Sequence, residues 1–241
     1  MIRTERDSDL VAWVRDLRVK ANARQSGALH YAKITRERRA DVCAELAQKQ
    51  ARAFVLASHK SNLREYINPR IGAMIASGKL YNWCLRLLLE RVTAWAEDWL
   101  QQNKLELCPL RLVLAERGGH DYDHLYAYFD RLRMQAESGT LFLKGKGLHP
   151  TLLDRSEWSV RPMAPWAGLQ LADVVASAFY QAANSASPTH DVAPAKMLSP
   201  IVPKRSDKIA ADFGVTVWPL PHQAPIPDEA KAIFQFYGYR S

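Results

Sequence analysis

Cysteines and long apolar runs are scarce in this sequence. It has three cysteines in 241 residues, and none forms a C-x-x-C pair. A disulfide framework or a zinc knuckle is therefore not expected, and a reducing compartment fits better. No stretch approaches the roughly 20 apolar residues of a membrane-spanning helix, and the opening MIRTERDSD lacks the apolar segment of a secretory signal. We expect a cytoplasmic protein without a membrane partner.

Several catalytic motifs are also missing. The sequence contains no G-x-S-x-G elbow, no P-loop and no G-x-G-x-x-G turn, so serine-hydrolase, kinase and dinucleotide-binding interpretations lack support. Its apolar fraction of 48% is typical of a globular chain that can bury a core. Eight of the thirteen prolines lie between residues 188 and 227. We therefore expect an α/β core over residues 1–187 and a proline-rich extension over 188–241 that packs on the same domain.

The positive charge is concentrated at one end of the chain. The formal net charge is +8, and residues 1–70 hold fifteen Lys and Arg against eight Asp and Glu. A field of this kind attracts phosphate backbones. The same pattern is typical of solvated helix surfaces, and composition leaves both interpretations open. On the first interpretation, the basic N-terminal third would bind nucleic acid.

Apolar periodicity predicts helices that alternate with short strands, which indicates a partly parallel α/β sheet. The helices are expected over residues 8–24, 35–49, 79–102, 121–138, 167–185 and 228–236, and the strands over 52–58, 110–116 and VTVWP. The mixed segment 139–162 predicts a hairpin or two short strands. In the helix over 79–102, large apolar residues follow a heptad pattern from Tyr81 to Trp99. That stripe fits either a core-facing helix or the seam of a homo-oligomer.

The helix over 167–185 is the most informative segment. It is apolar on most sides, yet Gln170, Asp173 and Ser177 form one narrow polar stripe at helical spacing. A buried carboxylate is costly unless it is paired, hydrogen-bonded or bound to a metal. Asp173 therefore needs a partner, and the spacing leaves open whether it is a metal ion or a cap or salt bridge.

Other candidates lie at the ends of predicted strands. Glu116 ends a central strand, where α/β sheets place their ligand sites, although an edge salt bridge with Arg117 would explain it equally well. His30 and Lys60 lie at element ends and could contact phosphate or simply be solvated. Together with Gln170 and Arg117, they are the candidate substrate-binding residues.

A cluster of metal-competent side chains follows Glu116. It contains His120, Asp121, Asp123 and His124, but the preceding Gly-Gly and an N-cap at Asp121 would put His120 outside the helix. Capping and solvation are the favoured interpretation of this cluster.

Several segments, in order, resemble one bacterial family. They are LHYAKITRERRADVCAELA, the strand ending in SHK, YNWCLRLLLERVTAW, ERGGHDY and above all AGLQLADVVASAF. The chain resembles domain-of-unknown-function family thirty-eight-hundred, from Leu29 to the terminal FYGY.

The resemblance implies a ribonuclease-H-like fold and a metal-dependent nuclease or related phosphoryl-transfer enzyme. Asp173 would be a metal-binding catalytic carboxylate, and Glu116 a looser match for another. The implied cofactor is Mg²⁺ or Mn²⁺ in two-metal hydrolysis. Members usually begin with a strand carrying Asp-Glu-Ser-Gly, which this sequence lacks. We therefore expect the first strand or hairpin to be absent, and the alternative is an inactive domain that binds nucleic acid or a partner protein.

Overall fold

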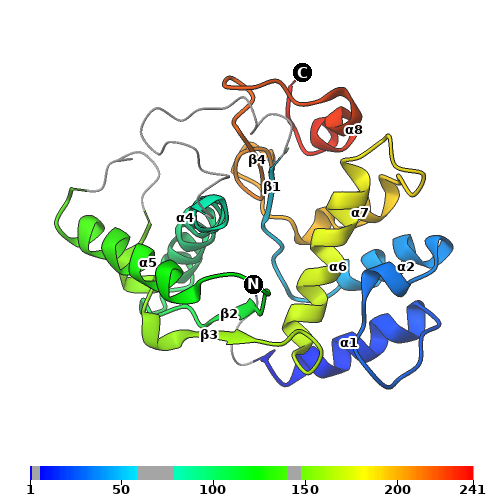
Figure 1. Cartoon of the computed structure of the whole chain (residues 1–241), viewed down its shortest axis with the longest axis horizontal. Coiled ribbons are helices and arrows are strands. Elements are labelled where there is room, and N and C mark those ends of the chain that lie inside the picture. Colours follow the sequence, from blue (N-terminus) through cyan, green and yellow to red (C-terminus); the bar gives the residue numbers. More distant parts are fainter. Residues whose placement is uncertain (2–5, 59–78, 141–147, 241) are drawn as a thin grey trace. The chain divides into compact units, whose positions relative to one another are not determined.

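The structure is a computed structural model that describes residues 1, 6–58, 79–140 and 148–240. The chain divides into two compact units (Figure 1). Unit 1 consists of Met1–Asn62 and Pro162–Ser241, and unit 2 of Leu63–Arg161. The division differs from the boundary predicted at residue 187. Its physical reason is a strand near residue 215 that pairs with one near residue 55, so the proline-rich tail helps to form the core of unit 1.

Unit 1 contains five helices and two strands among its described residues. They are α1 (Asp9–Lys20), α2 (Arg36–Ala47), β1 (Val55–Ser58), α6 (Ala167–Ala182), α7 (Ala193–Met197), β4 (Val215–Trp218) and α8 (Asp228–Phe236). All of these were predicted except α7. The strands pair in parallel with Val55 opposite Val215. Helix α6 packs against α1, α2 and α7 (Figure 1).

Apolar faces at helical spacing build the core of unit 1. Trp13, Val14 and Leu17 of α1 are buried, and α2 and α6 contribute similar stripes. Strand β4 is buried along its whole length, as expected for a short apolar strand covered on both faces. The Tyr239 hydroxyl accepts hydrogen bonds from the amides of Asp212 and Val217, both at 3.0 Å. These bonds fasten the end of the chain to β4.

The described residues of unit 2 contain two α-helices and a pair of parallel strands. They are α4 (Lys79–Gln102), β2 (Leu112–Ala115), α5 (Tyr122–Glu137) and β3 (Trp158–Arg161), with Leu112 opposite Trp158. Strand β3 lies in the segment predicted as a hairpin or two short strands. It pairs in parallel with β2, which lies outside that segment, and residues 141–147 of the segment lie outside the described residues.

The burial of α4 differs from the predicted heptad stripe. Its apolar members, from Tyr81 to Trp99, are only half-buried. The adjacent stripe, one position along, is the fully buried one, and it consists of Asn82, Arg86, Leu89, Thr93, Ala96 and Leu100. Periodicity therefore predicted the helix correctly but not the face that it buries.

The structure confirms a mixed α/β protein with small parallel sheets. The ribonuclease-H-like topology stays a prediction. In the described part of the chain, no helix combines the length and apolarity needed to cross a bilayer.

Candidate functional site around Asp173

The polar stripe of α6 faces the chain that connects α1 to α2. The Gln170 Oε1 atom accepts a hydrogen bond from the Leu29 amide at 2.7 Å, and its Nε2 donates to the Ala164 carbonyl at 2.7 Å. The Gln170 side chain is buried, with 3% of the residue exposed. The oxygen and the nitrogen of the side-chain amide thus both have backbone partners. Gln170 was predicted to bind substrate, and in the structure its side chain joins α6 to two other segments of the chain.

Asp173 lies one turn further along and is half-buried. Its Oδ2 accepts a hydrogen bond from the Tyr31 amide at 3.1 Å, and the Ser177 hydroxyl donates to its Oδ1 at 3.3 Å. The sequence predicted that this carboxylate must have a partner, and it does. The partners are a backbone amide and a hydroxyl rather than a guanidinium.

Gln181 extends the same stripe and was missed by the sequence reasoning. It accepts hydrogen bonds from the Tyr31 hydroxyl at 2.7 Å and from Arg39 at 3.0 Å, and it donates to the Thr189 carbonyl. Burial raises the pKa of Tyr31 above its usual range, which keeps this hydroxyl a donor. The signal was available, because Gln181 follows Ser177 at the same four-residue spacing.

Basic residues flank the contact between α6 and this connecting chain. Arg18 donates to the carbonyls of Gln25 and Gly27, and its Nη2 reaches the Gln170 Oε1 atom at 3.5 Å. His30 is half-buried directly before Tyr31, and Lys33 is exposed two residues after it. In the described residues, the hydrogen-bond partners of Asp173 are therefore the Tyr31 amide and the Ser177 hydroxyl, and Arg18 bonds to the connecting chain and to Gln170.

Glu116 and Arg117 belong to unit 2 and are both exposed. The Arg117 amide donates to the Tyr122 hydroxyl at 2.8 Å, and its guanidinium lies 5.7 Å from the centroid of the Tyr81 ring. In the described residues no ion pair joins Glu116 to Arg117, so the structure does not show the salt bridge that was the alternative interpretation of Glu116. A shared site of Glu116 with Asp173 stays a prediction, because the two lie in different units.

The capping interpretation of the neighbouring cluster is confirmed. Asp121 is the N-cap of α5, and its Oδ1 accepts a hydrogen bond from the His124 amide at 2.9 Å. The His120 ring makes edge contacts with Tyr81 and Tyr122, with centroids at 4.4 and 4.7 Å. Burial and the charge of Arg117 lower the pKa of His120, which favours its neutral form.

The residues around Asp173 do not by themselves make a magnesium site. Asp173 contributes one carboxylate, and both of its oxygens already accept hydrogen bonds. Two-metal sites need several carboxylates or similar ligands at one point. Within the described ranges, no three His, Cys, Asp or Glu side chains converge in a way that could hold a metal ion. Lys60, the remaining candidate, lies outside the described residues.

Comparison with known proteins gives no relative. No family model, no curated protein and no solved structure matches this chain. The resemblance to domain-of-unknown-function family thirty-eight-hundred thus stays an expectation from the sequence.

Proposed function

We propose that this protein binds nucleic acid through the basic surface of its N-terminal third. The observation that carries the proposal is how the charges of α1, α2 and the chain that connects them are distributed. Arg15, Arg24 and Lys33 are exposed, and they have no acidic partner among the described residues. These cations are free to contact phosphates, the sequence-independent term in nucleic-acid affinity.

The described acids of the same region form no ion pair with these three cations. Most of them are already engaged, Asp9 with Arg6, Asp16 and Glu45 with Lys49, and Asp41 with Arg38. The surplus of positive charge in the sequence therefore remains as a surplus on the folded surface. A positive patch of this kind also steers a polyanion toward the protein.

A salt titration tests this proposal. Each phosphate contact contributes about 0.9 to the slope of log affinity against log salt on duplex DNA. Replacing Arg15, Arg24 and Lys33 with Gln should reduce that slope by roughly 2 to 3. Fluorescence anisotropy with a labelled duplex between low and physiological salt would measure it.

The matched control removes the same amount of charge from paired cations. Arg6, Lys20 and Arg38 form ion pairs with Asp9, Glu45 and Asp41, and replacing these three with Gln gives an identical net charge. The proposal expects a smaller loss of slope in the control. Equal losses in the two triple variants would assign the binding to net charge alone.

Metal-dependent hydrolysis of phosphodiesters is a second candidate function. It is favoured by the half-buried carboxylate of Asp173 on α6, which accepts a hydrogen bond from the Tyr31 amide of the connecting chain. Hydrolysis requires more ligands than the described residues bring to Asp173. Single- and double-stranded substrates incubated with Mg²⁺ or Mn²⁺ would test it, with Asp173→Asn as the comparison. Equal cleavage by both proteins would remove Asp173 from the mechanism.

A further inference from the structure

A second basic feature of unit 1 lies far along the chain from α1 and α2. It is a hollow of about 100 Å³ beside the end of α8, lined by Ser199, Lys204, Lys208, Ile209, Ala210, Phe236, Tyr237 and Gly238. The rim carries exposed Lys204 and Lys208, and the Phe236 ring is 47% exposed. Two lysines thus lie on the rim of a hollow that also presents an exposed aromatic ring.

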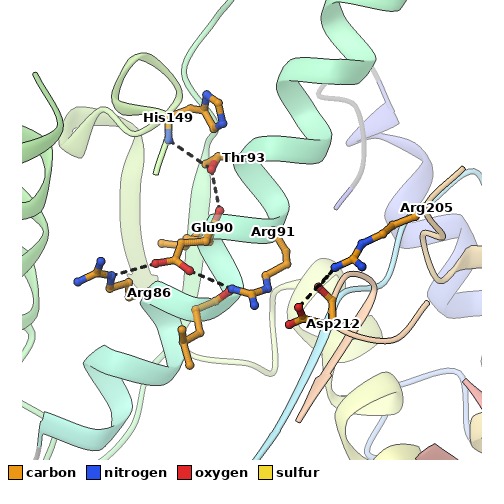
Figure 2. Close-up of polar contacts among 9 residues, drawn as sticks. Arg86, Glu90, Arg91, Thr93, His149, Arg205 and Asp212 are labelled. Carbon is orange, nitrogen blue, oxygen red and sulfur yellow. Dashed lines mark hydrogen bonds and ion pairs between the residues drawn. The ribbon is translucent and has the colours of Figure 1, made fainter. Parts of the chain in front are cut away.

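The loop that carries the two lysines is held in place. The Arg205 amide donates to the Ile209 carbonyl at 3.0 Å, and the Lys208 amide donates to the Arg205 carbonyl at 2.9 Å. The Arg205 guanidinium is in turn bonded to Asp212 (Figure 2). These bonds give the rim a defined position in the free protein, which lowers the entropic cost of binding.

Gly238 lets this loop approach the end of α8. It has a φ of +102°, and a Cβ at this position would lie 2.7 Å from the Ile209 Cγ2 atom. The buried Tyr237 beside it donates its hydroxyl to the Ala195 carbonyl at 2.6 Å. The floor is therefore a packed surface.

The charge around the hollow is not balanced. Asp207 accepts a hydrogen bond from the Ile209 amide at 2.9 Å, and Asp212 is engaged by Arg205. Lys204 and Lys208 have no acidic partner in the described parts of the chain. A third cation, Lys196, places its Nζ atom 5.3 Å from the centroid of the Phe236 ring.

We propose that this hollow binds one nucleotide of a single-stranded nucleic acid. Lys204 and Lys208 would contact its phosphate, and the exposed Phe236 ring would stack on its base. Aromatic rings bind single strands in this way because every base has a π-face, whereas the bases of a duplex are already stacked on one another. The inference rests on the proposed function only in that both concern nucleic acid, since the residues are different.

The test compares a labelled oligothymidylate with a duplex of equal length. Phe236→Ala should weaken binding of the single strand by about tenfold, the effect of losing one base–aromatic stack, and should leave the duplex unchanged. Phe236→Tyr, which keeps the ring, should restore single-strand binding. Replacing both Lys204 and Lys208 with Gln should weaken single-strand binding and reduce its salt dependence.

Two control variants exist in the same unit. Tyr180→Ala removes an aromatic side chain on α6 that is 76% exposed. Lys231→Gln removes a lysine of α8 that is paired with Asp228 at 2.6 Å. Neither should change single-strand affinity by more than about twofold, because surface changes away from a binding site have small effects.

The outcomes separate this inference from the proposed function. Unchanged single-strand binding by Phe236→Ala would contradict the proposal that the hollow binds a nucleotide. That conclusion would hold even if the triple variant of Arg15, Arg24 and Lys33 lost affinity for both the single strand and the duplex. If Phe236→Ala lost single-strand affinity and the triple variant lost none, the basic surface would be contradicted as a binding site and the hollow would be supported. Displacement of the oligothymidylate by an equal charge of polyglutamate would also overturn the hollow, as it would show a site for acidic chains in general.

Discussion

In unit 1 the buried amides of α6 bond to distant parts of the chain, whereas in unit 2 the buried charges of α4 bond to one another. Gln170 and Gln181 reach partners 141 and 150 positions away in the sequence. In α4 the Glu90 carboxylate lies 3.0 Å from the Arg86 Nε and 2.9 Å from the Arg91 Nη1 (Figure 2). One unit uses neutral long-range bonds and the other uses a local charge cluster.

The difference shows how each unit depends on its polar interior. A neutral amide that bonds to backbone groups joins two segments at little cost in desolvation. A buried carboxylate between two guanidinium groups is costly to desolvate, but it offsets part of the cost of burying both cations. We therefore expect unit 2 to be more sensitive to a single polar substitution than unit 1.

Removing the Glu90 charge should give the largest effect. Glu90→Gln leaves Arg86 and Arg91, whose side chains are 7% and 6% exposed, with less compensation in a buried site. Breaking a buried pair in this way costs about 3 to 5 kcal/mol. Urea unfolding would measure the loss in the free energy of unfolding.

Glu137→Gln is the matched control for Glu90→Gln. Glu137 pairs with Arg133 at 2.9 Å with the same four-residue spacing, but both side chains are exposed. Solvent screens an exposed pair of this kind, so we expect its removal to change the free energy of unfolding far less than Glu90→Gln does. Similar losses for the two variants would contradict the assignment of the charge cluster as the sensitive point of unit 2.

Removing a buried amide of α6 should have the next largest effect. Gln170→Leu leaves the Leu29 amide and the Ala164 carbonyl without their present partners. An unsatisfied buried group costs about 1 to 3 kcal/mol. Gln235→Leu, at an exposed position of α8, should change the free energy of unfolding by less than about 0.5 kcal/mol. If Gln170→Leu lost more free energy of unfolding than Glu90→Gln, unit 1 would be the more sensitive unit, contrary to our expectation.

Asp173 should show a smaller and more specific effect on stability. Asp173→Asn keeps an oxygen that can accept the Tyr31 amide, whereas Asp173→Ala removes it. We expect Ala to cost about 1 to 2 kcal/mol and Asn less than half of that. Thermal unfolding of the two variants would measure the difference, and equal losses would show that the hydrogen bond to Tyr31 is not the stabilising contact.

The reactivity of the cysteine thiols gives a separate measure of burial in each unit. This is the smallest of the expected effects. Burial raises the pKa of Cys43 in α2 from 9.0 to about 12 and that of Cys84 in α4 from 9.0 to about 11. Cys108 is exposed. A thiol reagent at pH 8 should label Cys108 first, then Cys84, and Cys43 last, because the thiolate is the reactive form. Mass spectrometry of each labelled peptide gives the three rates.

The same thiols predict a dependence of stability on alkaline pH. Above pH 9 the unfolded chain loses their protons while the folded chain keeps them, so the folded state binds more protons and the free energy of unfolding falls as pH rises. Cys43→Ser should reduce this fall. Labelling of Cys43 as fast as Cys108 would contradict the burial on which both predictions depend.

Local patterns predicted the elements better than their contacts. The helix over 79–102 and the terminal helix over 228–236 have the predicted bounds, and Asp121 caps its helix as expected. Each of these depends on neighbouring residues. The buried face of α4 was not predictable in the same way, because Asn82 and Arg86 are buried by tertiary contacts that override their polarity.

The candidate site shows the same limit. The spacing of Gln170, Asp173 and Ser177 predicted that α6 carries a polar stripe that needs partners, and the structure confirms that need. It could not identify the partners as the amides of Leu29 and Tyr31, because pairing over about 140 positions leaves no local pattern.

The pairing of β1 with β4 has a consequence for how the chain is made. On the ribosome, Val55 leaves the exit tunnel long before Val215, and all of unit 2 is synthesised between them. Until then the edge of β1 that accepts β4 is open, and open apolar edges pair with whatever strand is nearby. The strand pair of unit 1 can therefore form only after all of unit 2 has been synthesised, although β1 is available from the start.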